Sequence, residues 1–194
     1  MTAFCTILAD QPLPPNALDN MMVVLASMGQ DGSGVYQSGN VALGHRLTHI
    51  TPESIGEVQP AVDQERGVVI SADCRLDNRP FLCKILNTPS DLPDSQLVLL
   101  AYAKWGSACV DHLLGDFAFV IWDGEKLFCA RDFIGAKPFY YHPNPRRFVA
   151  SSDIETASSI SPTFVASSKK AKVATHTPAA HTSLPSASCH QPTR

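Results

Sequence analysis

The sequence lacks several features that mark whole classes of protein. Basic residues are not in excess: 15 lysines and arginines stand against 18 aspartates and glutamates, for a net charge of −3. This balance excludes a broad basic face of the kind that binds nucleic acid. No apolar run approaches the roughly 20 residues that a membrane-spanning helix needs, and no basic stretch followed by an apolar run opens the chain. We therefore expect a cytoplasmic protein that binds neither nucleic acid nor membrane.

Metal-binding and disulfide patterns are also missing. The six cysteines include no C-x-x-C pair, and no histidine lies at zinc-ligand spacing from a cysteine pair. Isolated cysteines in a cytosolic chain are mostly buried as small apolar side chains. His45 and His49 fall on the same side of an expected strand but have no third ligand. The sequence predicts no metal site and no disulfide framework.

Acidic residues are absent from the last part of the chain. None follows Glu155, and the stretch after it is rich in Ser, Thr, Ala, Pro and Lys. Such a composition buries too little apolar surface to offset the entropy lost on ordering. We expect one folded domain over residues 1–155 and a disordered, low-complexity tail over residues 156–194, which reads as if the natural reading frame had been lost.

The first 155 residues alternate between strand and helix patterns. An amphipathic helix is predicted over residues 17–29, where apolar residues recur at i, i+3, i+4 and i+7 before a glycine. Strands are indicated by β-prone runs with turn residues between them, including a hairpin turn at Asp123-Gly124. The expected strands cover 2–9, 34–47 (as a hairpin), 66–76 and, as a meander, 115–132, 139–145 and 146–152; further helices cover 79–86 and 90–106. This order suits two sheets packed face to face with helices outside.

Seven of these pieces, in order, resemble one family. They are DGSG (31–34), ALGHR (42–46), QP (59–60), LDNR (76–79), SDLPDSQLVLLAYAKWG (90–106), LLGDFAFVIWD (113–123) and ARDFIGAKPFYY (130–141). Together they are similar to the N-terminal domain of asparagine synthase-like proteins, a class II glutamine amidotransferase. The stretches LGHRLTHITPES and ADCRLDNR look closest to the branch that includes lasso-peptide macrolactam synthetases.

The resemblance implies a fold, a substrate and a partner. The fold would be that of N-terminal-nucleophile hydrolases, an α+β four-layer αββα sandwich of two mainly antiparallel sheets. Glutamine would be the substrate, and an ATP-dependent synthetase domain or subunit the partner. That partner carries a pyrophosphate loop of the type S-G-G-x-D-S, which nothing here matches. ATP and Mg²⁺ would therefore belong to a missing synthetase domain, and this chain itself would hold no cofactor.

The expected nucleophile is altered. In this class the first residue after Met1 attacks the amide, and its own α-amine serves as the base. The family has Cys there, whereas an ungapped reading puts Thr2 at that place and Cys5 inside the strand. We expect Cys5 to be a buried strand residue. Thr2 is the candidate nucleophile, although a hydroxyl is a weaker nucleophile than a thiol.

The expected glutamine pocket is altered as well. The family's arginine, which grips the α-carboxylate, falls on Leu47 without a gap, and only a one-residue deletion brings in Arg46. An oxyanion-hole Asn and a substrate-binding Glu fall on Ala72 and Cys74. Asp94 matches the family's acid for the α-amine, although it could equally be a first-turn helix acid.

Three hypotheses remain. The first is a glutamine amidotransferase-like domain of an amide-forming protein that has lost glutaminase activity. The second is an active amidohydrolase that uses Thr2, and the third is a non-catalytic interaction module or a truncated product. Arg131, Asp132 and Lys137 are expected to form a structural ion-pair cluster at a turn. The sequence leaves the oligomeric state, the carboxylate acceptor and the amine donor open.

Overall fold

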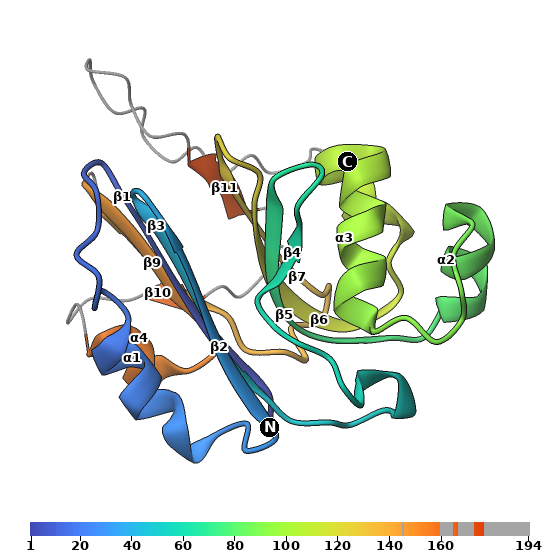
Figure 1. Ribbon diagram of the computed structural model, residues 1–194, viewed down its shortest axis with the longest axis horizontal. Helices are drawn as coiled ribbons and strands as arrows, with labels where there is room; N and C mark the ends of the chain where they lie inside the picture. The colour runs from blue at the N-terminus through green and yellow to red at the C-terminus, as the bar shows by residue number, and fades with distance from the viewer. Residues whose placement is uncertain (145, 160–164, 167–172, 177–194) are drawn as a thin grey trace.

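Two β-sheets stacked face to face form the centre of the protein. A computed structural model describes residues 1–144, 146–159, 165–166 and 173–176. Within these ranges helices cover the outer face of each sheet, as Figure 1 shows. The predicted α+β sandwich of helix, sheet, sheet and helix layers is confirmed.

The first sheet contains the start of the chain. Its strand order is β10-β8-β9-β1-β3-β2, and every described pair is antiparallel. All seven residues of β1 are buried, because the strand has a neighbour on both sides and a layer on both faces. The strands are β1 (Ala3–Ala9), β2 (Gly32–Ser38), β3 (Val41–Leu47), β8 (Tyr140–Asn144), β9 (Arg147–Ser151) and β10 (Val165–Ala166).

The second sheet has the order β11-β7-β6-β5-β4 and is also antiparallel. Its central hairpin turns at Asp123-Gly124, as predicted: the Asp123 carboxylate accepts the N–H groups of Glu125 and Lys126, and Gly124 has a φ of +92°. The strands are β4 (Ala61–Asp63), β5 (Val68–Leu76), β6 (Gly115–Trp122), β7 (Leu127–Arg131) and β11 (Val173–His176).

Helices form the two outer layers (Figure 1). The first sheet is covered by α1 (Asp19–Val24), its extension η1 (Leu25–Ser27) and α4 (Ile154–Ser158). The second is covered by α2 (Arg79–Leu86), α3 (Asp94–Trp105) and η3 (Gly106–His112), while η2 (Pro52–Ser54) lies in the loop after β3. The helix expected over 17–29 is therefore a short α-helix followed by a 3₁₀ turn. Helix α3 ends at Gly106, whose φ of +58° suits glycine.

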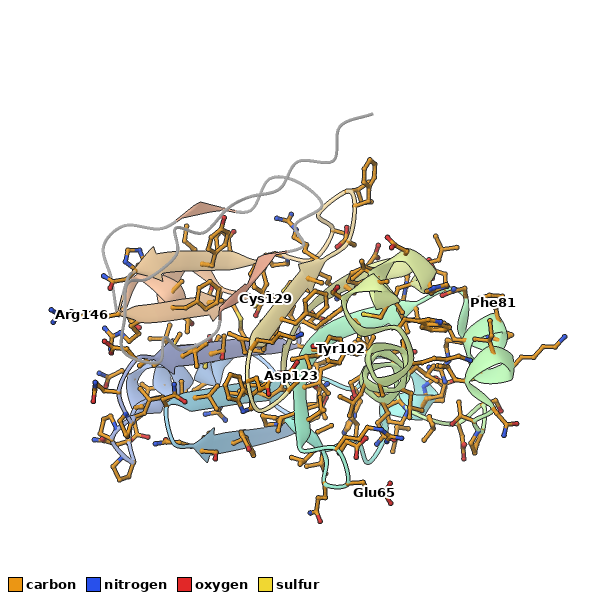
Figure 2. All side chains as sticks on the ribbon, turned by 90° about the horizontal axis from the view of Figure 1, so that it is seen from above. Glu65, Phe81, Tyr102, Asp123, Cys129 and Arg146 are labelled. Carbon is orange, nitrogen blue, oxygen red and sulfur yellow. The ribbon has the colours of Figure 1, made fainter. Side chains whose placement is uncertain are left out.

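Three buried apolar clusters lie between the four layers. Figure 2 shows side chains filling the space between the sheets and helices. The cluster between the sheets includes Phe4, Val120 and Phe139. The second sheet and α3 bury a cluster around Leu97 and Phe119, and the first sheet and α1 bury a third that includes Cys5 and Met21. Both faces of each sheet are therefore apolar.

The folded part of the chain extends past the expected domain boundary at residue 155. Helix α4 crosses this position, and its residues Thr156 and Ala157 are buried. The Asp153 side chain caps the helix by accepting the Thr156 N–H at 2.7 Å. Strands β10 and β11 pair with β8 and β7. The disorder predicted for 160–164, 167–172 and 177–194 lies outside the described residues.

None of the helices in the described ranges is long and apolar enough to cross a membrane.

Candidate functional site

A small polar cavity lies where β1 begins. Its volume is about 20 Å³, which is room for a water molecule and not for an amino acid. The walls come from the start of β1, the loop from Leu47 to Gln59, the end of β5 and the start of α3. The lining residues are Thr2, Leu47, Thr48, Ile50, Thr51, Ser54, Glu57, Gln59, Ala72, Asp73, Cys74, Asp94 and Ser95.

Thr2 faces this cavity, but its hydroxyl is engaged on both sides. Oγ1 donates to the Thr48 carbonyl at 3.2 Å and accepts the Thr48 N–H at 3.1 Å. The Met1 ammonium group donates to the Thr48 side-chain hydroxyl at 3.0 Å. In this arrangement the Thr2 hydroxyl joins β1 to the loop after β3, and it donates its proton to the Thr48 carbonyl.

Cys5 is a buried strand residue, as expected. Its side chain is 0% exposed and lies against Met22 Sδ at 3.9 Å, on the α1 side of the sheet. Burial raises the pKa of this thiol from 9.0 to about 12, so the thiolate that attacks an amide is not formed near neutral pH. Cys5 does not line the cavity.

Arg46 is turned away from the cavity. Residues 42, 44 and 46 of β3 share the face that packs on α1, whereas Leu47 faces the opposite way and lines the cavity. The Arg46 guanidinium donates to the Met22 carbonyl at 3.2 Å. The structure therefore brings Thr2 and Asp94 to one cavity but does not bring Arg46 there.

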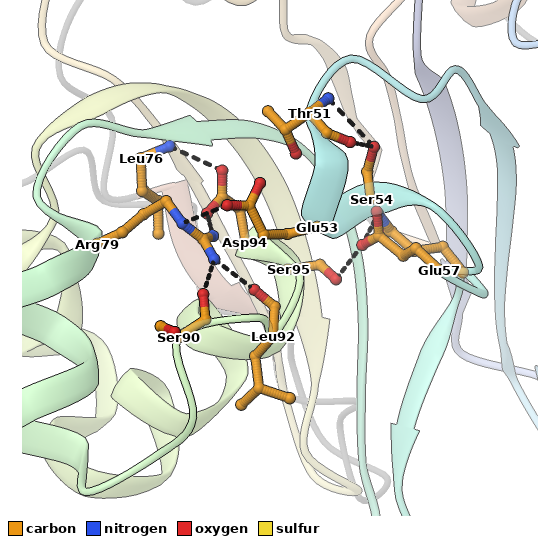
Figure 3. A network of polar contacts seen from close by, with 11 residues as sticks. Thr51, Glu53, Ser54, Glu57, Leu76, Arg79, Ser90, Leu92, Asp94 and Ser95 are labelled. Atoms are coloured by element: carbon orange, nitrogen blue, oxygen red, sulfur yellow. Dashed lines mark hydrogen bonds and ion pairs between the residues drawn. The ribbon is translucent and has the colours of Figure 1, made fainter.

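Asp94 is held by a neighbouring arginine, as Figure 3 shows. One carboxylate oxygen accepts the Leu76 N–H at 3.0 Å, and the other forms an ion pair with Arg79 Nη1. Arg79 Nη2 donates to the carbonyls of Ser90 and Leu92 at 2.9 and 2.8 Å. Burial raises the pKa of Asp94, while the Leu76 N–H and Arg79 act against that rise. Both oxygens of the expected ammonium-binding acid are thus occupied by the protein itself.

A second polar group closes the cavity from the loop side. The Glu57 carboxylate accepts hydrogen bonds from the Ser95 hydroxyl and from Gln59 Nε2 (Figure 3 shows the Ser95 contact). Gln59 also pairs with the backbone of Ala72, donating to its carbonyl at 3.0 Å and accepting its N–H at 2.7 Å. Ala72 is the residue at the expected oxyanion-hole position. Its methyl side chain has no hydrogen-bond donor, and its N–H is already bonded to Gln59 Oε1.

Lys137 pairs with an acid that the sequence does not single out. Its Nζ lies 2.7 Å from Asp73 Oδ1, and the Asp73 side chain is only 3% exposed. The ion-pair partner of Lys137 is therefore Asp73, which lies outside the expected cluster of Arg131, Asp132 and Lys137. Asp132 accepts the backbone N–H groups of Ala136 and Lys137, and Arg131 donates to the Gly135 carbonyl. These contacts shape a tight turn that carries Lys137 to β5.

The cavity is acidic. Its lining residues within the described part of the chain include the three acids Glu57, Asp73 and Asp94 but no lysine or arginine. Burial raises the pKa of each of these acids. Burial, followed by the negative charge of the three acids, raises the pKa of the neighbouring Cys74 thiol well above its usual value. Cys74 is therefore a poor nucleophile near neutral pH.

The two histidines do not form a metal site. His45 is buried between the sheets, 2.8 Å from Ser71 Oγ, whereas His49 lies beyond the end of β3 with its N–H on Asp31. The expectation that they share one side of a strand is therefore wrong. Among the described residues, no group of three His, Cys, Asp or Glu side chains could hold a metal ion.

The profile of the glutamine amidotransferase domain family matches residues 1–191. The chain belongs to this family. It is 33% identical over 146 residues to the asparagine synthetase [glutamine-hydrolyzing] 3 of Bacillus subtilis, covering 71% of this chain and 24% of that protein. It is 30% identical over 130 residues to the asparagine synthetase B [glutamine-hydrolyzing] of Escherichia coli, covering 63% of this chain and 23% of that protein. The glutamine amidotransferase domain therefore spans about a quarter of the length of these relatives.

A solved structure supports the fold of the glutamine amidotransferase domain. The glutamine phosphoribosylpyrophosphate amidotransferase from B. subtilis superimposes with a TM-score of 0.68 at 16% identity, covering 84% of this chain and 44% of that one. The N-terminal-nucleophile hydrolase fold implied by the sequence motifs is thus confirmed. The chain is an asparagine synthase-like class II amidotransferase domain.

The sequence patterns do not indicate Arg79 or Glu57 as residues of this site, and they give Lys137 different partners. LDNR is one of the motifs that carry the family resemblance, but nothing local indicates that its arginine reaches Asp94 across the loop 88–93. Asp73 next to Cys74 was a usable signal, because a buried acid on a central strand needs a cation.

Proposed function

We propose that this amidotransferase domain has lost glutamine hydrolysis and serves as the N-terminal part of an asparagine synthetase-like, ATP-dependent amide-forming protein. Its remaining role is structural, namely to pack against a synthetase domain. In this proposal ATP and Mg²⁺ are bound by the synthetase domain. The B. subtilis relative supports such a partner, since this chain matches only 24% of its length.

The observation that carries the proposal is the charge of the cavity. An amino acid presents an α-carboxylate, and an enzyme that binds it needs a cation such as a bidentate arginine. The described lining instead has three carboxylates and no basic side chain. Arg46 lies on the other face of β3, Arg79 is paired with Asp94, and Lys137 is paired with Asp73. The α-carboxylate of glutamine would therefore find no unpaired cation in the described lining.

The state of Thr2 supports the same conclusion. An N-terminal nucleophile needs its hydroxyl proton within reach of its own α-amine. With Met1 attached, the Thr2 hydroxyl is satisfied by both the N–H and the carbonyl of Thr48. Breaking these contacts would be required before any attack, and the oxyanion position offers an alanine whose N–H is already bonded to Gln59.

Ammonia release from glutamine tests the proposal. The purified chain, shown by intact mass to lack Met1, is compared with its Thr2→Ala variant and with the glutamine-hydrolyzing E. coli asparagine synthetase B as the positive control. We expect both forms of this chain to stay at the rate of the blank. Ammonia release above the blank that disappears in Thr2→Ala would show an active amidohydrolase and overturn the proposal.

The partner is tested separately. The DNA that follows the gene is translated in all frames, and we expect a reading frame with a pyrophosphate loop of the type S-G-G-x-D-S. Co-expression of that segment should give a complex that co-purifies with this domain. A downstream region without such a segment, or a segment that fails to co-purify, would contradict the structural role.

A further inference from the structure

Strand β2 is an open edge of the first sheet. The strand order places it last, with β3 on one side and no described strand on the other. It is seven residues long, GSGVYQS, and contains no lysine, arginine, aspartate, glutamate or proline. Natural edge strands are commonly protected by charges, prolines or bulges, because their unpaired backbone groups recruit other strands. This edge has none of those devices, and its pairing with β3 runs without a break from Gly32 to Ser38.

The pairing pattern identifies which backbone groups point outward. The Ala9 N–H donates to the Asn40 carbonyl at 2.9 Å, which fixes the alternation of hydrogen bonds across β3. Even-numbered residues of β3 then bond to β1 and odd-numbered ones to β2. Through the register, the even-numbered residues of β2 bond to β3, so Ser33, Val35 and Gln37 direct their N–H and C=O groups away from the sheet. No described residue donates to or accepts from these outward groups.

The side chains of the same three residues lie on the α1 side of the sheet. Tyr36 packs into the cluster between the two sheets, so its neighbours in the strand point the other way. Gln37 confirms this, because its Nε2 donates to the carbonyls of Leu13 and Pro14 at 3.3 and 2.9 Å. Val35 is 55% exposed, which leaves an apolar side chain uncovered beside unpaired backbone.

We propose that β2 pairs with β2 of a second copy of this chain, antiparallel and centred on Val35. A two-fold axis at Val35 sets Ser33 opposite Gln37 and Gln37 opposite Ser33, so each outward N–H meets an outward C=O. About six backbone hydrogen bonds form, spaced by roughly 6.8 Å along the strand, which is the distance between alternate residues. The strand is thus complementary to itself.

The side chains of β2 are compatible with pairing to a second copy of β2, and the strand contains no charged residue. The two Val35 side chains meet on the same face as a cross-strand apolar pair, and Ser33 lies beside Gln37 of the second copy as a polar pair. Two six-stranded sheets become one continuous sheet across the axis. Because a single strand pair buries less than the roughly 1,200 Å² of a standard interface, the dimer is of the weak, concentration-dependent class.

Sedimentation of the full chain over roughly 10–500 µM tests the proposal. We expect the mass to rise from monomer toward dimer with concentration. Val35→Lys should keep the chain monomeric over this range, with at least about a tenfold weaker association, because two like charges then face each other across the axis. The matched control is Val23→Lys on α1, which is 73% exposed and adds the same charge away from the edge. A wild-type chain that stays monomeric, or a Val35→Lys chain that dimerises like Val23→Lys, overturns the proposal.

Cross-linking gives a second measurement that does not depend on the lysine variant folding. In a Cys189→Ser background, Val35→Cys should form a disulfide-linked dimer under mild oxidation, because facing residues of an antiparallel pair lie about 5.5 Å apart at Cα. Val23→Cys in the same background should not. Equal cross-linking of the two variants would show that the disulfides form by random collision and would overturn the proposed pairing of β2 with β2. Neither result depends on ammonia release, so the proposed function is tested independently.

Discussion

Acid should destabilise this domain through one buried histidine. The His45 side chain is 0% exposed between the sheets; Nδ1 is 2.8 Å from Ser71 Oγ, and Nε2 has no hydrogen-bond partner among the described residues. Burial lowers the pKa of His45 from 6.5 to about 3. Between pH 3 and pH 6.5, His45 is therefore protonated in the unfolded chain and neutral in the folded chain.

The sign and size of the effect follow from this difference. A lowered folded-state pKa means that the stabilisation is complete above pH 6.5 and declines as the pH falls toward 3. The free energy of unfolding should fall by about 1.4 kcal/mol per pH unit in this window, or about 2 kcal/mol between pH 7 and pH 5. Glu57, Asp73 and Asp94 act in the opposite direction, because their raised pKa values make the folded state bind protons more readily than the unfolded state.

Urea unfolding of wild type and of His45→Asn at a series of pH values measures the contribution of His45 to the pH dependence of stability. His45→Asn keeps a polar atom near the Nδ1 position, so it retains a partner for Ser71 without a titratable ring. The stability difference between wild type and His45→Asn should shrink by about 2 kcal/mol from pH 7 to pH 5. Ser71→Ala should lower stability but keep the wild-type pH slope, because the ring stays buried. Parallel pH profiles for wild type and His45→Asn would refute the reasoning.

Three further predictions concern packing and charge. Arg79→Ala leaves the Asp94 carboxylate buried without its cation and should lower the free energy of unfolding by about 3–5 kcal/mol. The control Arg66→Ala removes an exposed ion pair with Asp63 and should change the free energy of unfolding little. Equal effects of the two variants in urea unfolding would contradict the description of the site. Gly44→Ala places a Cβ 2.5 Å from Met22 Sδ and should lower the free energy of unfolding by about 1–3 kcal/mol. The control Gly32→Ala, whose new Cβ has its nearest contact at 3.6 Å, should leave stability nearly unchanged. A Gly44→Ala chain as stable as wild type would show that this packing is looser than described. Cys74 should react with iodoacetamide at neutral pH at least about tenfold more slowly than a free cysteine, as measured by mass spectrometry; rapid labelling would contradict the acidic cavity.

Local patterns were sufficient to predict most of the secondary structure. The hairpin of β2 and β3, helix α2 over Arg79–Leu86 and the turn at Asp123-Gly124 follow from short-range propensity and turn chemistry. Short elements were missed. The three-residue strand β4 has no periodicity to detect, and α4 lies where the composition resembles a tail. Its cap at Asp153 was a visible signal that was outweighed by that composition.

The candidate site was predictable only in part. Thr2 and Asp94 were placed in one pocket by motif position, and the structure puts both there. Arg46 was misplaced because a one-residue shift along a strand turns a side chain to the other face. Strand alternation alone indicates that Arg46 and Leu47 cannot share a pocket.

The sequence by itself determined the family and the two-sheet architecture, because these depend on motifs and on contacts between near neighbours. Only the tertiary structure decided which charges meet. Arg79 reaches Asp94, and Lys137 reaches Asp73 from a turn 64 residues further along the chain (137 − 73). Such pairs form because packing of the sheets and helices brings distant segments to one end of the sandwich. Burial then requires every charge there to find a partner within the protein, which is why the cavity has no cation left for a substrate carboxylate.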